Sequence, residues 1–226
     1  MIKFAPEGYP FIFGSLLITF IASLLILWSL KSGGSQTTFY LLFGASLFFL
    51  LITFFMVFFF RDPERAIPEG KGLFISPADG KVILVKDVHE KEYLNSDVKE
   101  ISIFMSPLDV HINRAPCDGK VSVVKYSPGK FMAAYKDDAS VKNENIVMVL
   151  DAERDRMLVR QVAGFVARRA VCRVKAGDML KRGERYGLIK FSSRLDVYLP
   201  KDAQIKVRPG DKVKAGETVI AVDSRQ

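Results

Sequence analysis

The sequence lacks charge over two long stretches. No Asp, Glu, Lys or Arg occurs from Gly8 to Leu30, and none from Ser32 to Phe60. Phenylalanine is concentrated in the same part of the chain, where residues 1–60 hold 13 of the 18. These runs exclude a freely soluble protein, and the overall 49% hydrophobic content excludes a disordered one. The chain is therefore predicted to be membrane-anchored, with one extramembrane domain.

Cysteine and histidine are also scarce. Cys117 and Cys172 are the two cysteines, and neither a C-x-x-C pair nor a Cys/His cluster is present, so neither a disulfide nor a metal site is expected. Basic runs interleaved with aromatic residues are missing too, which argues against nucleic acid as a partner. Residues 61–226 nevertheless carry 31 basic and 24 acidic side chains, a balance that favours contact with an anionic lipid surface.

The two uncharged runs predict a transmembrane hairpin. A bilayer core of roughly 30 Å needs about 20 apolar helical residues. Phe11–Leu30 supplies 20 and Phe39–Phe60 supplies 22, with a turn-like segment between them. A cleaved signal peptide before a single span is the alternative, but the first run is long and lacks a basic n-region and a small-x-small cleavage site. By the positive-inside rule, the basic residues after the second run place the following domain on the cytoplasmic side of the cell (inner) membrane: Arg61, Arg65 and Lys71.

Residues 61–226 are predicted to be mainly β. Short β-branched runs alternate with Asp-Gly, Pro-Gly and Ala-Gly turns. Gly164–Val174 is less regular and is expected to contain a short helix, and the aperiodic stretch Phe131–Glu144 predicts a functional loop. The expected strands cover residues 81–86, 101–104, 120–125, 145–150, 157–162, 195–199 and 218–222.

Two internal repeats favour a barrel-like or hammerhead-like β domain with a few short helices, following the hairpin of residues 1–60. Pro77–Val82 recurs as Pro116–Val121, and Val174–Glu184 recurs as Val207–Glu217. The second repeat is typical of lipoyl and biotinyl carrier folds. A carrier would present its lysine within Met-Lys-Met or Asp-Lys-Ala, and neither tripeptide occurs. The repeats are therefore interpreted as scaffold rather than as a carrier arm.

Several motifs resemble the phosphatidylserine decarboxylase family, most closely its short class of phosphatidylserine or archaetidylserine decarboxylase-related proteins. The resemblance runs from about Phe60 to the C-terminus, with the motifs in the family's order and approximate spacing. They are Phe60–Arg65, Ser76–Val82, Met105–Pro116, Pro128–Phe131, Asn143–Asn145 and Tyr186–Pro200.

The resemblance implies a proenzyme that cleaves itself into chains 1–192 and 193–226. In this family a serine attacks the preceding carbonyl, and β-elimination of the resulting ester leaves a covalently bound pyruvoyl group at the new N-terminus. The serine carried onto that role is Ser193, and the cleavage site is the bond between Ser192 and Ser193. Ser192 departs from the glycine usual in the family and supplies a second hydroxyl. Ser193 remains preferred because the Arg-x-Asp-x-Tyr-x-Pro pattern follows it in the family register.

A serine hydroxyl needs a base to become a nucleophile. His111 is the candidate, since imidazole is the ordinary base near neutral pH, whereas His89 lies in a charged, surface-like stretch. The family match favours Asp79 as the acid that orients His111, in the manner of a hydrolase triad, over its repeat twin Asp118. Arg114 stands where many longer relatives have a second histidine, so His111 must carry the base role without one.

The implied reaction converts phosphatidylserine to phosphatidylethanolamine and CO2 through a Schiff base with the pyruvoyl carbonyl, without an external cofactor. A homodimer and a membrane phospholipid substrate are the implied partners. Lys130, Lys142 and Asn143 are candidate headgroup contacts, or else solvated loop residues. Two other functions stay open: a decarboxylase of another serine lipid such as archaetidylserine, and a membrane-anchored hammerhead adaptor without catalysis.

Overall fold

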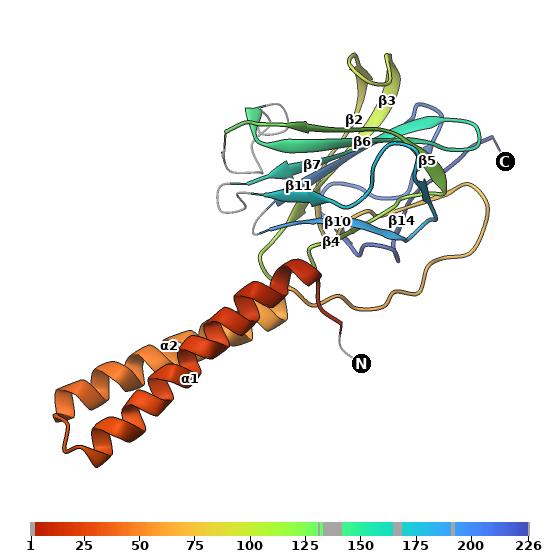
Figure 1. Ribbon diagram of the computed structural model, residues 1–226. Coiled ribbons are helices and arrows are strands. Elements are labelled where there is room, and N and C mark those ends of the chain that lie inside the picture. Colours follow the sequence, from red (N-terminus) through yellow and green to blue (C-terminus); the bar gives the residue numbers. More distant parts are fainter. Residues whose placement is uncertain (1–2, 131, 133–141, 165–168, 191–192, 226) are drawn as a thin grey trace. The chain divides into compact units, whose positions relative to one another are not determined.

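The computed structural model describes residues 3–130, 132, 142–164, 169–190 and 193–225. The chain divides into two compact units, Met1–Pro63 and Glu64–Gln226. The first unit is helical, and the second contains the strands (Figure 1).

Two long helices make up most of the first unit. A short 3-10 turn, η1 (Pro6–Gly8), leads into α1 (Tyr9–Lys31), and α2 spans Gln36–Phe59. Ser35 caps α2, because its hydroxyl accepts a hydrogen bond from the Thr38 N–H at 3.2 Å. Both helices agree with the predicted runs to within three residues at each end.

The helices α1 and α2 contact each other through small polar side chains. The Thr53 hydroxyl donates to Ser15 Oγ at 2.9 Å, and the hydroxyls of Ser23 and Ser46 lie 3.3 Å apart. Large apolar side chains point outward instead, so that Trp28 is 68% and Leu41 70% exposed. Small residues at the helix contact and an apolar outer surface are typical of helices packed in lipid. Both helices are long and apolar enough to cross a membrane.

The second unit is built from antiparallel strands, most of them short. An eight-stranded sheet has the order β13-β2-β3-β11-β7-β6-β5-β9, and two three-stranded sheets have the orders β1-β14-β12 and β4-β10-β8. The strands are β1 (Leu73–Ile75), β2 (Gly80–Glu90), β3 (Ser96–Met105), β4 (Ile112–Arg114), β5 (Gly119–Ser127), β6 (Asn145–Asp151), β7 (Arg156–Ala163), β8 (Ala170–Cys172), β9 (Met179–Leu180), β10 (Arg185–Ile189), β11 (Ser193–Pro200), β12 (Gln204–Ile205), β13 (Lys212–Val213) and β14 (Val219–Val222).

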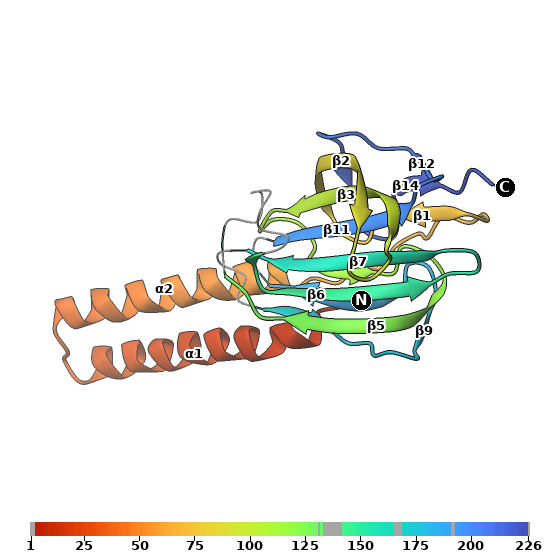
Figure 2. The same cartoon turned by 90° about the horizontal axis from the view of Figure 1, so that it is seen from above.

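The large sheet is strongly curled, as a half-barrel (Figures 1 and 2). Its strands alternate their side chains between two faces, and one face supplies most of the apolar core. All seven strands predicted from the sequence are confirmed, as is the mainly β class. The short helix expected within Gly164–Val174 is not seen in the described part of that segment, where Ala170–Cys172 form strand β8. Residues 165–168 and 133–141 lie outside the described residues.

The internal repeats correspond to repeated structure. Val82 N–H donates to the Asp211 carbonyl at 2.9 Å, and Val121 N–H donates to the Asp178 carbonyl at 2.8 Å. The turns of the two copies also match, since Gly183 and Gly216 have φ angles of 81° and 82°. Glycine adopts this left-handed conformation without the steric penalty of a Cβ atom, which explains why both copies have it. The prediction that the repeats form the scaffold agrees with this geometry.

Candidate active site

Ser193 is the first residue of β11, which lies in the middle of the large sheet. It is opposite Met105 on β3 and Ala163 on β7. The side chain is fully buried, and its hydroxyl points to the thioether sulfur of Met105 at 3.4 Å. Thioether sulfur is a weak acceptor, so this hydroxyl is held loosely compared with one bonded to oxygen.

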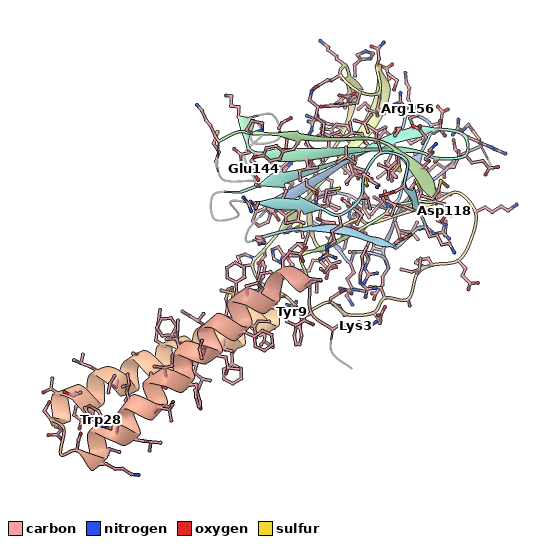
Figure 3. All side chains as sticks on the ribbon, in the orientation of Figure 1. Lys3, Tyr9, Trp28, Asp118, Glu144 and Arg156 are labelled. Atoms are coloured by element: carbon pink, nitrogen blue, oxygen red, sulfur yellow. The ribbon has the colours of Figure 1, made fainter. Side chains whose placement is uncertain are left out.

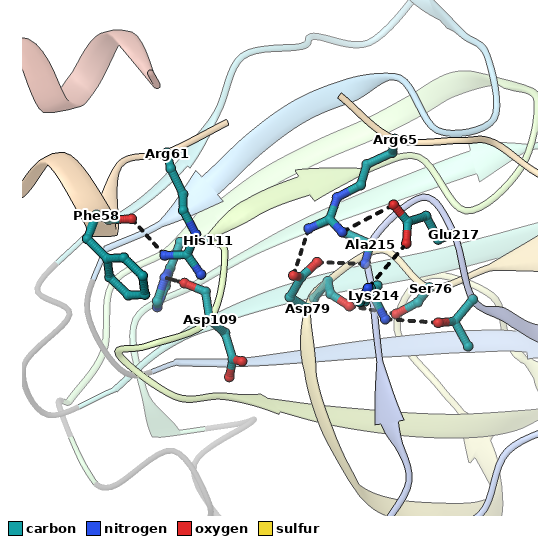
Figure 4. A network of polar contacts seen from close by, with 12 residues as sticks. Phe58, Arg61, Arg65, Ser76, Asp79, Asp109, His111, Lys214, Ala215 and Glu217 are labelled. Atoms are coloured by element: carbon teal, nitrogen blue, oxygen red, sulfur yellow. Dashed lines mark hydrogen bonds and ion pairs between the residues drawn. The ribbon is translucent and has the colours of Figure 1, made fainter. Parts of the chain in front are cut away.

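His111 lies in the turn between β3 and β4 and is 2% exposed. Its Nδ1 atom is 3.0 Å from the carbonyl oxygen of Asp109 (Figure 4). A carbonyl oxygen can only accept, so Nδ1 carries the hydrogen and Nε2 keeps the lone pair. This tautomer leaves Nε2 as the atom able to take a proton.

The backbone around His111 is tied to the segment that precedes Ser193. The Ile189 N–H, at the end of β10, donates to the His111 carbonyl at 3.4 Å, and β10 pairs with β4 directly after the histidine. Met105, which contacts Ser193, ends the strand that leads into the His111 turn. The fold therefore brings the two motifs to the same end of the β domain.

A buried pair of amides lies beside Met105. Asn113 Nδ2 is 3.9 Å from the Met105 sulfur, and Asn113 Oδ1 accepts a hydrogen bond from Gln161 Nε2 at 2.8 Å. Both amides are essentially inaccessible to solvent. Buried amides of this kind need partners, and here they fix the packing around the sulfur that faces Ser193.

Asp79 makes its described hydrogen bonds away from His111 (Figure 4). Its Oδ2 accepts from Arg65 Nη2 at 2.8 Å, and its Oδ1 accepts from the Ala215 N–H at 2.8 Å. Burial raises the pKa of Asp79 above its ordinary value, and the Ala215 N–H and the Arg65 charge act against that rise. The described contact of the His111 ring is with the Asp109 carbonyl, and the role of Asp79 as the acid that orients His111 stays a prediction.

The three residues expected to contact a headgroup differ in burial. Lys130 and Lys142 are exposed, whereas Asn143 is 1% exposed. Asn143 Nδ2 donates to the Ala163 carbonyl at 2.8 Å, and its Oδ1 accepts from the Met132 N–H at 2.9 Å. Asn143 thus supports the strand residue opposite Ser193. Ser192, the other half of the expected cleavage site, lies outside the described residues.

The remaining residues singled out in the sequence lie elsewhere. Arg114 is buried and donates through Nη1 to the Gly183 carbonyl at 2.9 Å, so its guanidinium stabilises the turn of the repeat Val174–Glu184. His89 is half exposed and contacts Asp97 at 2.9 Å on the β2–β3 hairpin. Asp118 lies at the opposite end of the domain from Glu144, whose carbonyl accepts from Ala163 N–H (Figure 3).

Sequence reasoning missed the roles of several groups around this site. Asp109 acts through its main-chain carbonyl, which no side-chain pattern can indicate. Met105 and Gln161 lie in strands and read as ordinary core positions. Asn113 was visible within the Met105–Pro116 motif, but nothing in its spacing tied it to Gln161, which is 48 residues away.

Comparisons with known proteins point to one family. A sequence model described as phosphatidylserine decarboxylase matches residues 52–221. A phosphatidylserine decarboxylase proenzyme of Geobacter metallireducens is 45% identical over 222 residues, covering 96% of this chain and 95% of the relative. Proenzymes of the same name from Symbiobacterium thermophilum and Syntrophus aciditrophicus are 44% and 48% identical, covering 96% and 72% of this chain and 94% and 76% of the respective relatives.

Proposed function

The chain belongs to the phosphatidylserine decarboxylase family, and from this premise we propose how its residues perform the reaction. It is a self-processing proenzyme that becomes a pyruvoyl-dependent decarboxylase of phosphatidylserine, releasing CO2 and phosphatidylethanolamine. The observation that carries the assignment of residues is the position of Ser193, which is buried at the start of the central strand β11 and which the family resemblance suggests as the first residue after the chain break.

Ser193 is proposed as the nucleophile of self-cleavage. Its Oγ attacks the carbonyl carbon of Ser192 while the hydroxyl proton passes to a base, and the peptide bond is exchanged for an ester. Loss of the proton on the Ser193 α-carbon then expels the Ser192 carboxylate. The resulting unsaturated residue takes up water and loses ammonia, which leaves a pyruvoyl group on residue 193.

His111 is proposed as the base for this step. Because the Asp109 carbonyl holds the hydrogen on Nδ1, Nε2 can accept the Ser193 proton without a change of tautomer. The protonated ring then keeps its Nδ1–H bond to Asp109, which stabilises the charge that forms. A second histidine is not required for this geometry, which accommodates Arg114 at the place where longer relatives have one.

The surroundings of Ser193 fit a pyruvoyl group. Conversion replaces the serine hydroxymethyl by a methyl group, and the neighbours of Ser193 are the apolar core residues Met105 and Ala163. A methyl group is more compatible with a thioether than a hydroxyl is, so the pocket suits the product of maturation at least as well as the precursor. When present, the pyruvoyl carbonyl withdraws electrons from the α-carbon of the bound serine headgroup.

Asp79 is proposed to hold the future small chain in place. The bonds to Ala215 and, through Arg65, to Glu217 at 3.3 Å connect residues 65–79 to the segment that becomes the small chain. After cleavage these contacts join two separate polypeptides. Asp79 therefore helps keep the small chain, and with it residue 193, in place.

The apolar helices α1 and α2 are proposed to span the membrane, with the β domain on the cytoplasmic side. A membrane anchor keeps the enzyme at the surface where its lipid substrate resides. The serine headgroup chemistry is common to diacyl and archaeol lipids, and the relatives named for phosphatidylserine favour the diacyl substrate. A homodimer, which the family resemblance implies, remains a prediction.

Intact-mass analysis of the purified full chain tests the proposal. We expect two polypeptides, residues 1–192 and 193–226, the smaller being 34 residues long with a blocked N-terminus that reacts with hydroxylamine. The preparation should release CO2 from phosphatidylserine vesicles. A single intact 25.4 kDa chain that still decarboxylates the lipid would contradict the mechanism.

A further inference from the structure

Arg194, the residue that follows Ser193 in β11, belongs to a buried cluster of charged side chains. The Arg194 side chain is 1% exposed, and its Nε atom donates to Asp196 Oδ1 at 2.5 Å. Its Nη2 atom donates to Ser102 Oγ at 2.8 Å and to Glu100 Oε1 at 3.3 Å. Asp196, Ser102 and Glu100 are buried as well.

This cluster connects β11 to β3 on the sheet face opposite the main core. Leu195 and Val197 belong to the core, so Arg194 and Asp196 point to the other side by alternation. In the strand register Arg194 is opposite Phe104 and Asp196 is opposite Ser102. The guanidinium therefore reaches along the neighbouring strand rather than straight across it.

The cluster makes the register of β11 hard to change. A slip of one residue would turn Arg194 into the apolar core and turn Ser193 out of it. Burying a guanidinium without its carboxylates is strongly unfavourable, so the slipped arrangement is disfavoured beyond the loss of strand hydrogen bonds. Burial lowers the pKa of Arg194, but Asp196 and Glu100 raise it further, so the side chain stays charged.

Self-cleavage creates a specific need for such a restraint. Once the chain breaks before residue 193, that residue becomes a terminus, and termini fray unless side chains or strand pairing hold them. The hydroxyl of Ser193, which makes a weak contact to Met105, is lost in maturation. The next side chain along the strand is that of Arg194.

We infer that Arg194, held by Asp196, Glu100 and Ser102, is a positioning residue that keeps the new N-terminus of the small chain in register between β3 and β7. The inference rests on the proposed cleavage before Ser193. The inference distinguishes the proenzyme from the mature enzyme, because in the proenzyme the strand is also held by its covalent connection to residue 192. Loss of the cluster should therefore affect the mature enzyme more than the proenzyme.

The test compares Arg194→Lys with Arg160→Lys in the full chain. Lysine keeps the charge of Arg194 and loses its fork of donors. Arg160 is the matched control: it lies on β7 in register with Asp196, and its Nη1 donates at 3.2 Å to the hydroxyl of Tyr198, which is five residues beyond Ser193. Three quantities are measured for each variant: the rate of self-cleavage, kcat and KM on phosphatidylserine vesicles, and amide hydrogen exchange in residues 194–198.

For Arg194→Lys we expect self-cleavage within about 3-fold of the wild-type rate, and in the mature enzyme a kcat about 10-fold lower with KM unchanged. Amide exchange in residues 194–198 should be about 10-fold faster than in the mature wild type. The same substitution placed in uncleavable Ser193→Ala protein should change exchange by less than about 2-fold. Arg160→Lys should leave all three quantities near their wild-type values.

Equal acceleration of exchange in the uncleavable background would overturn the inference, because Arg194 would then stabilise the sheet in general. Wild-type kcat and exchange in mature Arg194→Lys would overturn it too. If that variant does not fold, Ser102→Ala, which removes one neutral partner of the guanidinium, is measured in the same way with the same criteria. A wild-type chain that never cleaves before residue 193 would instead refute the proposed function, and this is seen before any variant is made.

Discussion

Asp79 and Asp118 are structural equivalents in the two copies of the internal repeat. Asp79 Oδ1 accepts the Ala215 N–H at 2.8 Å, and Asp118 Oδ1 accepts the Arg182 N–H at 2.9 Å. The two residues differ in the contact made by the second carboxylate oxygen and in how far they are buried. Asp79 also forms a 2.8 Å ion pair with Arg65 and is 9% exposed, whereas Asp118 is exposed. The shared bond belongs to the turn, and the ion pair is particular to Asp79.

This equivalence makes Asp118→Asn the matched control for Asp79→Asn. Asparagine can keep the turn hydrogen bond in both places, but at residue 79 it leaves the guanidinium of Arg65 without its closest carboxylate. We expect Asp79→Asn to lower the free energy of unfolding by about 3 kcal/mol, as for other buried pairs that lose one partner. Asp118→Asn should cost less than about 0.5 kcal/mol.

Urea unfolding and the yield of small chain that copurifies with residues 1–192 measure these effects. Asp79→Asn should also mature more slowly, because Arg65, which also contacts Glu217 in the future small chain, loses its closest carboxylate and is held less firmly. Equal effects of the two substitutions would show that the Arg65 pair contributes nothing beyond the turn. A larger effect of Asp118→Asn would contradict the assignment of residue 79 altogether.

Much of the scaffold could be predicted from the sequence. The seven expected strands were found because short β-branched runs bounded by glycine turns are a strong signal for strands. The uncharged runs gave the two helices, and the repeated Gly-Asp motif indicated the repeated turns. Among the described residues, seven further strands of two to five residues were missed, Ala170–Cys172 among them, since such short segments carry little periodic signal.

The site was less predictable because its geometry depends on contacts distant in sequence. The family register suggests Ser193 as the nucleophile and residue type suggests His111 as the base, and both stay predictions. A hydrolase triad suggested Asp79, whereas the described contact of His111 is to the Asp109 carbonyl. Asn143 stood in an irregular polar segment and was expected to meet solvent or headgroup. It is buried instead, and its Nδ2 atom donates a hydrogen bond to the Ala163 carbonyl.

Substitution of the two adjacent serines distinguishes the nucleophile. Ser193→Ala should abolish both cleavage and decarboxylation, because alanine has no hydroxyl to attack the preceding carbonyl or to be eliminated. Ser192→Gly and Ser192→Ala should still cleave, since residue 192 contributes only the carbonyl. Denaturing gels followed by intact mass of each band show the result. Cleavage in Ser193→Ala together with its loss in Ser192→Ala would reverse the assignment.

Substitutions of Asn143 and Lys130 should distinguish a residue that stabilises the fold from one that contacts the lipid. Asn143→Ala removes buried hydrogen bonds to Met132 and Ala163 and should lower the free energy of unfolding by about 2 kcal/mol. Lys130→Ala, at an exposed position, should leave stability and maturation unchanged and raise KM for phosphatidylserine vesicles. A raised KM in Asn143→Ala with wild-type stability would instead make Asn143 a headgroup contact.

The two cysteines should resist alkylation in the folded protein. Burial raises the pKa of Cys117 to about 12 and also raises that of Cys172. The reactive form is the thiolate, and at pH 8 a thiol of this pKa is ionised in only about one molecule in 10⁴. Iodoacetamide should therefore leave Cys117 unlabelled at pH 8 until urea is added, and the reactivity should rise with pH. Rapid labelling of native Cys117 at pH 8 would show that its surroundings are open to solvent.

The last prediction concerns the base and uses the two histidines as a matched pair. His111→Ala should slow maturation by about 10²–10⁴-fold, the usual contribution of a positioned general base. His89→Ala should mature at the wild-type rate, because His89 is half exposed and its contact is with Asp97 on the β2–β3 hairpin. His111→Asn gives a finer test, since its amide Nδ2 takes the place of the ring Nδ1 and can donate to the Asp109 carbonyl but cannot accept the Ser193 proton, so it should fold like the wild type and still fail to cleave. A time course of cleavage, with circular dichroism as the check on folding, measures all three variants. Normal maturation of well-folded His111→Asn would mean that another group takes the Ser193 proton and that the 3.0 Å contact to Asp109 stabilises the turn rather than taking part in the chemistry.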